Sequence, residues 1–408
     1  MFSRKTTIIY VIIVFFLSIF ILTSINKENN PNSNQNIVQV DEHPPKVSYQ
    51  NINELWIDDG IYACGNGTWS DIEAANSWCV DVNGDGSLYL IENITLTNPD
   101  GIGSPFIIAN STVDFIIQNC TFTNSDAVYG DAGIKLLNAS NGNIYGCDIS
   151  NNNGKGIMLY EHCANITIKN NTINRNEEGI YIRWDNYRNN YAINNTIRDC
   201  IVNGIAMFED GSIAENNTIE GGAGCIAANG DNIVIRNNTL SGSHNGINAA
   251  AFSNNLTISG NTMTNVGINL THNGDGFRTM EIFTNNTVNG KPVYYYKDQM
   301  GLDTANFTRV GDPGQILLFN CSYSTISNFN ISYTSMGIQL ISHSSYNNIT
   351  HNRLRNNDYG IKLSYDCHNN TIMNNTLNDS FYNNIQLMYY NKNNTIIDNS
   401  VTGGGYGI

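Results

Sequence analysis

Residues 165–182 read NITIKNNTINRNEEGIYI and contain one complete unit of a repeat. The first half of the unit is a short apolar alternation, an Asn-Asn-Thr turn and a further apolar residue, Ile173. The second half is a strand that begins at Gly179-Ile180 after a polar turn. Other first halves end at Phe122, Ile149, Ile197, Ile219, Leu240, Met263, Val288, Ile331, Leu354, Leu377 and Val401. Other second halves begin at Gly133, Gly156, Gly204, Gly246, Gly267, Gly337 and Gly360. A period of roughly 21 to 27 residues predicts a solenoid.

The repeat favours a parallel β-helix. Each unit holds runs of three or four alternating residues, which suit short strands and not helices. The Leu spacing of leucine-rich repeats is absent, and Ile, Val and Thr dominate. Three strands and three turns need about 22 to 24 residues per coil. We therefore expect Ile173, Ile197, Ile219 and Leu240 to form one inward ladder, and Asn side chains to stack at the turns.

Composition limits the partners. The chain has 408 residues, 41% of them apolar, only 13% charged, and a net charge of −15. Nucleic-acid binding needs basic patches, which this balance disfavours. Divalent cations and glycans remain compatible with it.

The sequence divides into four parts. Residues 1–25 carry Arg4 and Lys5 before an apolar run, which favours an uncleaved single-pass signal-anchor helix over a signal peptide. Either alternative exports the repeats, and an anchor would keep them extracellular at the cell membrane. Residues 26–50 form a flexible linker and residues 51–104 an N-terminal cap and first coil. Residues 105–408 are the repeats, with modified coils and a longer loop at 290–316, and no cap follows the last strand, which suggests a truncated end.

With these repeats the chain resembles the NosD-like parallel β-helix family, in its archaeal cell-surface type. The repeats of this family are also called carbohydrate-binding and sugar-hydrolysis domains. The resemblance rests on the NNTI and Gly-Ile units, GKPVYYYKD from Gly290 and NSWCVDVNGDGSLYLIENITL from Asn76. It implies a right-handed, all-β helix. The same fold carries lyases, hydrolases, epimerases, tailspikes and inert surface proteins, so it does not fix an activity. The copper role of NosD does not carry over, because no Met and His pair has ligand spacing.

One turn is a candidate carbohydrate site. Aligning coils on Gly156, Gly179 and Gly204 places three tripeptides at the same turn. They are Tyr160-Glu161-His162, Arg183-Trp184-Asp185 and Phe208-Glu209-Asp210. Aromatic rings here would stack on sugars, and Glu161, Asp185 and Glu209 would accept hydroxyl hydrogen bonds or serve as weak catalytic candidates. A solvated turn is the simpler alternative.

Two further patterns predict stabilising sites. Residues 81–92, DVNGDGSLYLIE, match a calcium loop with ligands Asp81, Asn83, Asp85 and Glu92, although NGDG is also a good hairpin turn. The disulfide candidates are Cys64, Cys79, Cys120 and Cys147, with buried thiols as the alternative. Many Asn-x-Ser/Thr sequons would allow glycosylation of an exported chain.

These patterns predict a membrane-anchored, extracellular β-helix that binds carbohydrate at the cell surface. A polysaccharide lyase or glycoside hydrolase is the alternative, and a structural coat protein is a third hypothesis.

Overall fold

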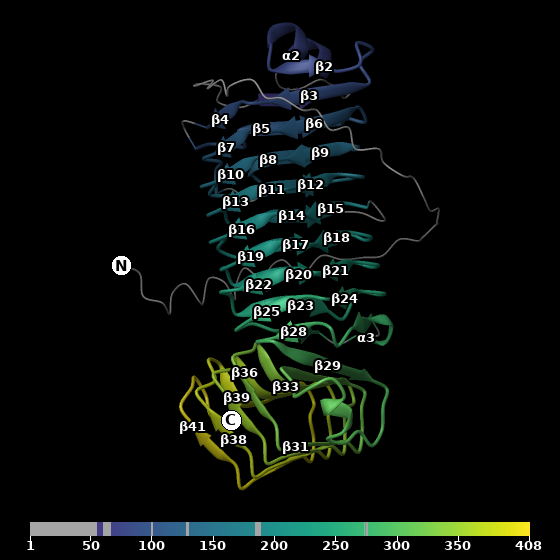
Figure 1. The fold of residues 1–408 in the computed structure, drawn as a ribbon, viewed down its shortest axis with the longest axis vertical. Helices are drawn as coiled ribbons and strands as arrows, with labels where there is room; N and C mark the ends of the chain where they lie inside the picture. The colour runs from purple at the N-terminus through teal and green to yellow at the C-terminus, as the bar shows by residue number, and fades with distance from the viewer. Residues whose placement is uncertain are drawn as a thin grey trace. The chain divides into compact units, whose positions relative to one another are not determined.

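A computed structural model describes residues 55–59, 67–98, 101–127, 130–183, 189–272, 274 and 276–408. The predicted anchor at 1–25 and linker at 26–50 lie outside these ranges. Residues Ser48–Ile408 form one compact unit. Its described part is a parallel β-solenoid made of two successive stacks of coils (Figure 1).

The first stack has three sheets, and each coil contributes one strand to each; sheet 2 has one further strand, which forms an antiparallel hairpin. Sheet 1 holds β1 (Leu55–Asp58), β5 (Phe106–Ala109), β8 (Ala132–Leu137), β11 (Lys155–Tyr160), β14 (Ile180–Arg183), β17 (Asn203–Met207), β20 (Gly224–Ala228), β23 (Asn245–Ala250) and β26 (Ile268–Thr271). Sheet 2 holds β2 (Cys79–Asp81), β3 (Leu88–Glu92), β6 (Asp114–Gln118), β9 (Gly142–Tyr145), β12 (Thr167–Lys169), β15 (Tyr191–Ile193), β18 (Ile213–Glu215), β21 (Val234–Arg236), β24 (Thr257–Ser259) and β27 (Glu281–Ile282). Sheet 3 holds β4 (Thr95–Thr97), β7 (Thr121–Thr123), β10 (Asp148–Ser150), β13 (Thr172–Asn174), β16 (Thr196–Arg198), β19 (Thr218–Glu220), β22 (Thr239–Ser241), β25 (Thr262–Thr264) and β28 (Thr287–Val288).

The second stack repeats this plan. Its first sheet continues sheet 3, and the two together form one 14-stranded sheet. The part in the second stack, here called the junction sheet, holds β29 (Lys291–Lys297), β30 (Gln315–Phe319), β33 (Met336–Ile341), β36 (Tyr359–Ser364) and β39 (Asn383–Met388). Its other two sheets hold β31 (Thr325–Ser327), β34 (Asn348–Thr350), β37 (Thr371–Met373) and β40 (Thr395–Ile397), and β32 (Asn330–Ser332), β35 (Arg353–Arg355), β38 (Thr376–Asn378) and β41 (Ser400–Thr402).

The inward apolar ladder is confirmed. Ile173 pairs with Ile197, Ile197 with Ile219, and Ile219 with Leu240 in the registers of sheet 3. All four side chains are at most 1% exposed. Stacking equivalent residues in this way buries one apolar side chain from each strand of sheet 3.

Asn ladders run beside the apolar ones, as the sequence predicts. The longest consists of buried Asn171, Asn195, Asn217, Asn238, Asn261 and Asn286. In each step the amide nitrogen donates to the amide oxygen of the next coil at 2.9–3.1 Å. Each amide nitrogen also donates to a backbone carbonyl of the preceding coil. These bonds satisfy polar groups at the turn that would otherwise be buried without hydrogen-bond partners.

A short helix covers the first coils. In α2 (Trp69–Ala75), the Thr68 side chain and Asp71 form a capping box at the N-terminus. Trp69 is buried against the rings of Tyr89 and Phe115, at centroid distances of 5.2 and 5.6 Å. Its indole nitrogen donates to Ser111 Oγ at 2.8 Å. The amphipathic ring therefore closes the core and keeps its polar group bonded.

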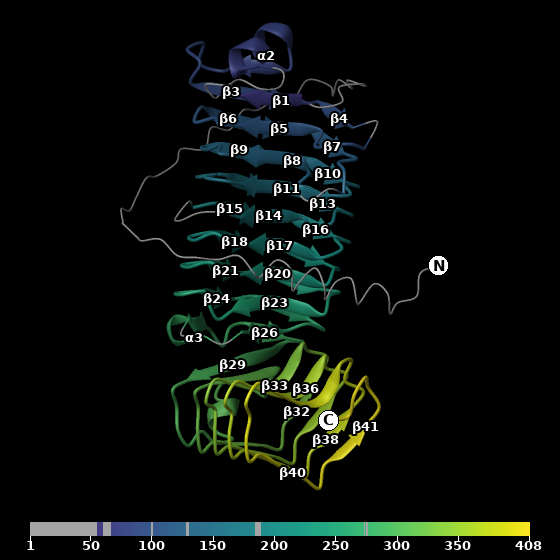
Figure 2. The ribbon, with the colours of Figure 1, turned by 180° about the vertical axis from the view of Figure 1, so that it is seen from behind.

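The chain reverses between the two stacks. Strand β28 pairs antiparallel with β29 through the two-residue turn Asn289-Gly290, whose φ angles are 51° and 75°. This is the Asn-Gly hairpin geometry, in which both central residues need positive φ. The predicted long loop is present between β29 and β30 and holds the short helix η1 (Asn306–Thr308). The second stack itself was not predicted, and its strands are inclined to those of the first (Figure 2).

The junction sheet closes the end of the first stack. Its face with Leu317 and Phe319 belongs to the first core, while Ile316 and Leu318 belong to the second core. Strand β26 would otherwise leave a free edge. The buried amide of Gln315 accepts from Ile268 N at 2.9 Å and donates back to Ile268 O. Gln339 pairs with Leu270 in the same way, at 3.2 and 2.8 Å. Two glutamines thus replace a neighbouring strand and protect the edge.

Candidate functional site

Glycines shape the outer face of sheet 1. Gly156 N donates to Glu178 O at 2.8 Å, and Ile157 N donates to Gly179 O at 2.9 Å. A Cβ on Gly156 would lie 2.6 Å from Gly179 O, so only glycine fits. Two consecutive bonds of this kind make a local bulge. As a result, the residue before each glycine turns to the outer face.

Charged and amide side chains occupy that position on three successive coils: Lys155, Glu178 and Asn203. Asn203 Nδ2 donates to Glu178 Oε1 at 3.0 Å. Lys155 Nζ forms an ion pair of 2.6 Å with Glu177 and lies 5.6 Å from the centre of the Tyr181 ring. Together these contacts place a carboxyl, an amide and an ammonium group side by side on the outer face of sheet 1, although all three residues are buried.

A column of partly exposed side chains runs beside this cluster. Tyr160 pairs in register with Arg183, and Phe208 N donates to Ile182 O at 2.8 Å. Arg183 Nη1 donates to Tyr181 Oη at 2.8 Å, and the Tyr181 and Phe208 rings are 5.7 Å apart. The alignment of Tyr160, Arg183 and Phe208 read from the sequence is therefore present. We call Tyr160, Arg183 and Phe208, with Lys155, Glu178, Tyr181 and Asn203, the outer patch.

The carboxylates of the predicted turn do not gather there. Glu161 is exposed at the turn with φ of 48°. Glu209 is only 2% exposed, and its Oε2 accepts from Asn190 Nδ2 at 3.0 Å. The expected pair of exposed carboxylates is thus not formed by these two residues, because Glu209 satisfies a buried amide instead. Trp184 and Asp185 lie outside the described residues.

Glu178 has the most perturbed carboxyl of the patch. Burial raises its pKa to about 7, while the charge of Lys155 and the hydrogen bond from Asn203 act in the opposite direction. A group that titrates near neutrality is suited to proton transfer. One signal in the sequence could have indicated this residue. The position before the repeat glycine holds a polar or charged residue on three successive coils, namely Lys155, Glu178 and Asn203.

The predicted calcium loop is a hairpin turn. Strands β2 and β3 pair antiparallel, and the carboxylate of Asp81 accepts from the backbone nitrogens of Asn83, Gly84 and Gly86 at 3.2, 3.0 and 2.7 Å. Asp85 accepts from Ser87 N. The fourth predicted ligand, Glu92, follows the residue that pairs with Cys79, at the opposite end of the hairpin, and accepts from Gln118. The calcium interpretation is therefore not supported. The Asp81 carboxylate already accepts hydrogen bonds from backbone amides of the turn, and the strand register places Glu92 away from the turn.

The eight cysteines among the described residues are buried thiols. Cys120 and Cys147 occupy adjacent coils next to the paired residues Thr121 and Asp148, as their repeat positions predict. Both are free, and so is Cys79, while its predicted partner Cys64 lies outside the described residues. Burial raises the pKa of Cys79 to about 12. The alternative of a thiol ladder, rather than a disulfide, is the one found for Cys120 and Cys147.

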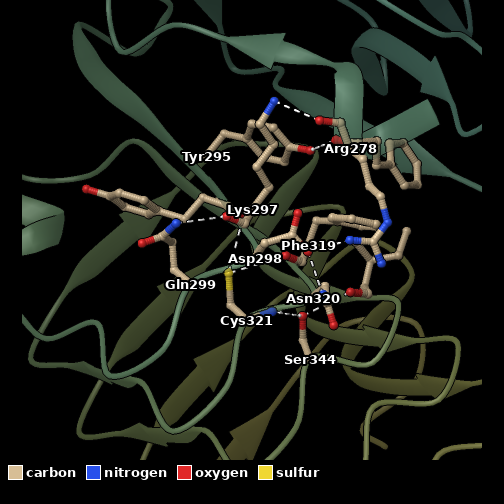
Figure 3. A network of polar contacts seen from close by, with 12 residues as sticks. Arg278, Tyr295, Lys297, Asp298, Gln299, Phe319, Asn320, Cys321 and Ser344 are labelled. Carbon is tan, nitrogen blue, oxygen red and sulfur yellow. Dashed lines mark hydrogen bonds and ion pairs between the residues drawn. The ribbon is translucent and has the colours of Figure 1, made fainter. Parts of the chain in front are cut away.

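A second polar cluster lies at the junction (Figure 3). Asp298 accepts from Arg278 Nη1 at 2.7 Å and from Asn320 Nδ2 at 2.5 Å. Lys297 Nζ donates to the carbonyls of Arg278 and Met280 and to Glu281, at 2.9, 3.0 and 2.6 Å. These bonds hold the end of α3 (Gly276–Thr279) on the junction sheet. Because the charges pair with each other, this cluster fastens the stacks together.

Two kinds of feature are missing from the described ranges. They contain no group of three or more His, Cys, Asp or Glu residues that could hold a metal ion. No helix among them is long and apolar enough to cross a membrane.

Comparison with known proteins agrees with the fold. Residues 59–190 match the family profile described as right-handed beta helix region, and residues 209–407 match the one described as periplasmic copper-binding protein (NosD). The chain is thus a right-handed parallel β-solenoid. The two matches together support a NosD-like right-handed β-helix family. The described residues do not provide the metal cluster that the copper description would imply. No curated protein matches the sequence.

Solved structures with similar coils include three carbohydrate-related or surface proteins. The A-module of mannuronan C-5 epimerase AlgE4 from Azotobacter vinelandii is 14% identical, with 88% of this chain and 95% of that chain covered and a TM-score of 0.36. A tailspike protein double mutant of E. coli bacteriophage HK620, in complex with a pentasaccharide, is 11% identical, with 87% and 70% covered and a TM-score of 0.30. The Streptococcus pneumoniae surface adhesin PfbA is 14% identical, with 83% and 88% covered and a TM-score of 0.26. At these scores none of them carries an argument about the function of this chain.

Proposed function

We propose that this chain is an exported β-helix protein that binds carbohydrate through the outer patch. The observation that carries the proposal is the column of Tyr160, Arg183 and Phe208, whose partly exposed side chains lie in register on adjacent coils. Aromatic faces bind the apolar side of sugar rings, and guanidinium and amide groups bind their hydroxyls. Strands spaced about 4.8 Å apart hold these groups rigidly. Trp184 and Asp185 would extend the same column, as the sequence predicts.

The experiment is a glycan array on the exported part of the chain, residues 51–408, followed by titration of the best glycan. Phe208→Ala and Tyr160→Ala should each weaken binding about two- to twelvefold, because an aromatic contact contributes about 0.5–1.5 kcal/mol. Trp184→Ala is expected to behave in the same way. Tyr145→Ala is the matched control, since this exposed ring lies on β9 in sheet 2. Undiminished binding by all three variants, with folding intact by circular dichroism, would reject the outer patch.

A polysaccharide-processing enzyme is the second candidate. One observation favours it, namely the pKa of about 7 at Glu178. Catalysis would require substrate to reach a residue that is only 7% exposed, so binding is the better-supported activity. Release of new reducing ends or unsaturated sugars by the wild type, and its loss in Glu178→Gln, would identify the enzyme.

A further inference from the structure

The junction sheet extends beyond the end of the first stack. Gln339 on β33 holds the edge of β26. Lys362 on β36 pairs in register with Gln339, and Gln386 on β39 pairs with Lys362. Lys362 and Gln386 therefore lie on the same face of the junction sheet as Gln339. They are one and two strands beyond Gln339 in the order β30, β33, β36, β39. On β30, Leu317 packs into the first core. Figure 1 shows β36 and β39 next to the end of the first stack.

Lys362 is a cation in a poor environment for its charge. Its Nζ lies 4.7 Å from the centre of the Tyr359 ring, and the side chain is only partly exposed. Loss of solvent lowers its pKa to about 8, and no charged neighbour contributes to this shift. Among the described residues, no carboxylate forms an ion pair with Lys362. An anion that bound here would restore what the ammonium loses by desolvation.

Aromatic rings flank this lysine. Tyr359 stacks on Tyr382 with a centroid distance of 5.1 Å and an interplanar angle of 23°. Both rings are partly exposed. Tyr382 also approaches His244 of the first stack, at 5.7 Å, and His244 Nδ1 lies 3.4 Å from Asp358 Oδ1. The rings are thus fixed by contacts from both stacks.

Unused hydrogen-bonding capacity lies on the same two strands. Gln386 Nε2 donates to Asn383 Oδ1 at 3.3 Å, whereas its Oε1 is buried without a partner in the structure. A buried acceptor without a donor is costly unless a ligand supplies one. A sugar hydroxyl is a donor of the required kind.

We propose that Tyr359, Lys362, Tyr382 and Gln386, here called the corner site, bind one sugar unit that bears a carboxylate. The carboxylate pairs with the Lys362 ammonium, the sugar ring packs against Tyr382, and a hydroxyl donates to Gln386 Oε1. Two adjacent strands carry all four residues or their immediate neighbours, so the site is preorganised. The inference rests on the proposed function in one respect only, namely that the ligand is a saccharide. It concerns a different surface from the outer patch.

The test uses the full chain with lysine labelled by ¹³C at Cε, and the Lys362 resonance is assigned by its absence in Lys362→Arg. The chemical shift of Lys362 is titrated against pH with D-glucuronate, D-glucose or acetate at equal ionic strength. Glucuronate should raise the apparent pKa of Lys362, and glucose should leave it unchanged. Acetate should shift it less than glucuronate, since it lacks the ring and the hydroxyls. No glucuronate-dependent shift, or an equal shift with acetate, would overturn the proposal.

Binding supplies a second readout. An oligogalacturonate should bind wild type more tightly than its methyl ester does, and Lys362→Met should abolish that difference with a loss of about tenfold. Lys392→Met, which removes an exposed lysine from a turn, should retain it. Equal affinity of wild type for the acid and the ester would count against the corner site. Even in that case, loss of array binding in the outer-patch variants would support the proposed function. The corner site and the outer patch can therefore be rejected independently.

Discussion

At the scale of single residues, Glu178 makes the stability of the folded protein depend on pH. Its folded pKa of about 7 lies above the value of about 4.3 expected in an unfolded chain. Between these values the folded protein retains a proton that the unfolded chain has released. The contribution of Glu178 to stability is therefore full below the unfolded pKa and is lost as pH rises towards the folded pKa.

Replacing Glu178 by Gln should remove this pH dependence. The variant should gain stability over wild type at pH 8, on the order of 3 kcal/mol, and show little gain at pH 4. Urea unfolding of both proteins at the two pH values measures the difference. Glu177→Gln is the control, because this residue pairs with Lys155 at 2.6 Å and its loss should destabilise the protein at pH 8. A Glu178→Gln variant less stable than wild type at pH 8 would contradict the assignment.

The sequence could indicate only part of this residue-scale chemistry. Repeat alignment correctly superposed Tyr160, Arg183 and Phe208, because coil register follows from the period. It gave no indication that Glu209 turns inward to Asn190, because side-chain direction at an irregular turn depends on tertiary packing. Glu178 was missed for a similar reason, since its outward direction results from a bulge at the glycine.

At the scale of elements, the Asn ladder was the most predictable feature. The NNT motif places one Asn at positive φ and the next in the buried ladder, as Asn216 and Asn217 show. Asn217 Nδ2 donates to Ala192 O and to Asn238 Oδ1, at 2.8 and 3.0 Å. Its Oδ1 accepts from both nitrogens of Asn195. A single residue thus connects three coils.

Asn217→Ala should destabilise the protein by about 3 kcal/mol or more, because it leaves several buried groups without partners. The midpoint of urea unfolding measures the loss. Thr218→Ala, at the exposed adjacent position, should change stability by about 0.5 kcal/mol or less. Equal effects from the two substitutions would show that the ladder adds no stability beyond the strand itself.

At the scale of the molecule, the junction decides where the first stack ends. The sequence did indicate a chain reversal here, since Asn289-Gly290 between short strands is a strong hairpin pattern. Its meaning was obscured because apolar repeats continue on both sides with nearly the same period. The roles of Gln315 and Gln339 could not be read from sequence, because side-chain bonding to a strand edge depends on how two stacks meet.

Gln339→Leu should loosen this junction. Leucine keeps much of the volume but leaves Leu270 N and O without their partner, so we expect a loss of about 2 to 4 kcal/mol. Hydrogen exchange should accelerate at β26 before it does so at β14. Gln299→Leu, at an exposed turn, is the control. Unchanged exchange at β26 in the Gln339 variant would show that the glutamine does not protect the edge.

The glutamine closure also constrains the order of assembly. Most coil-to-coil bonds in the first stack join residues about 21 to 30 positions apart, as in the Asn ladder, so each new coil can form on its predecessor. The bonds that close β26 join residues 47 and 69 positions apart. A chain that emerges from its N-terminus therefore exposes an open strand edge until Gln339 has been made. During that interval the nascent protein is most vulnerable to pairing with another copy of itself.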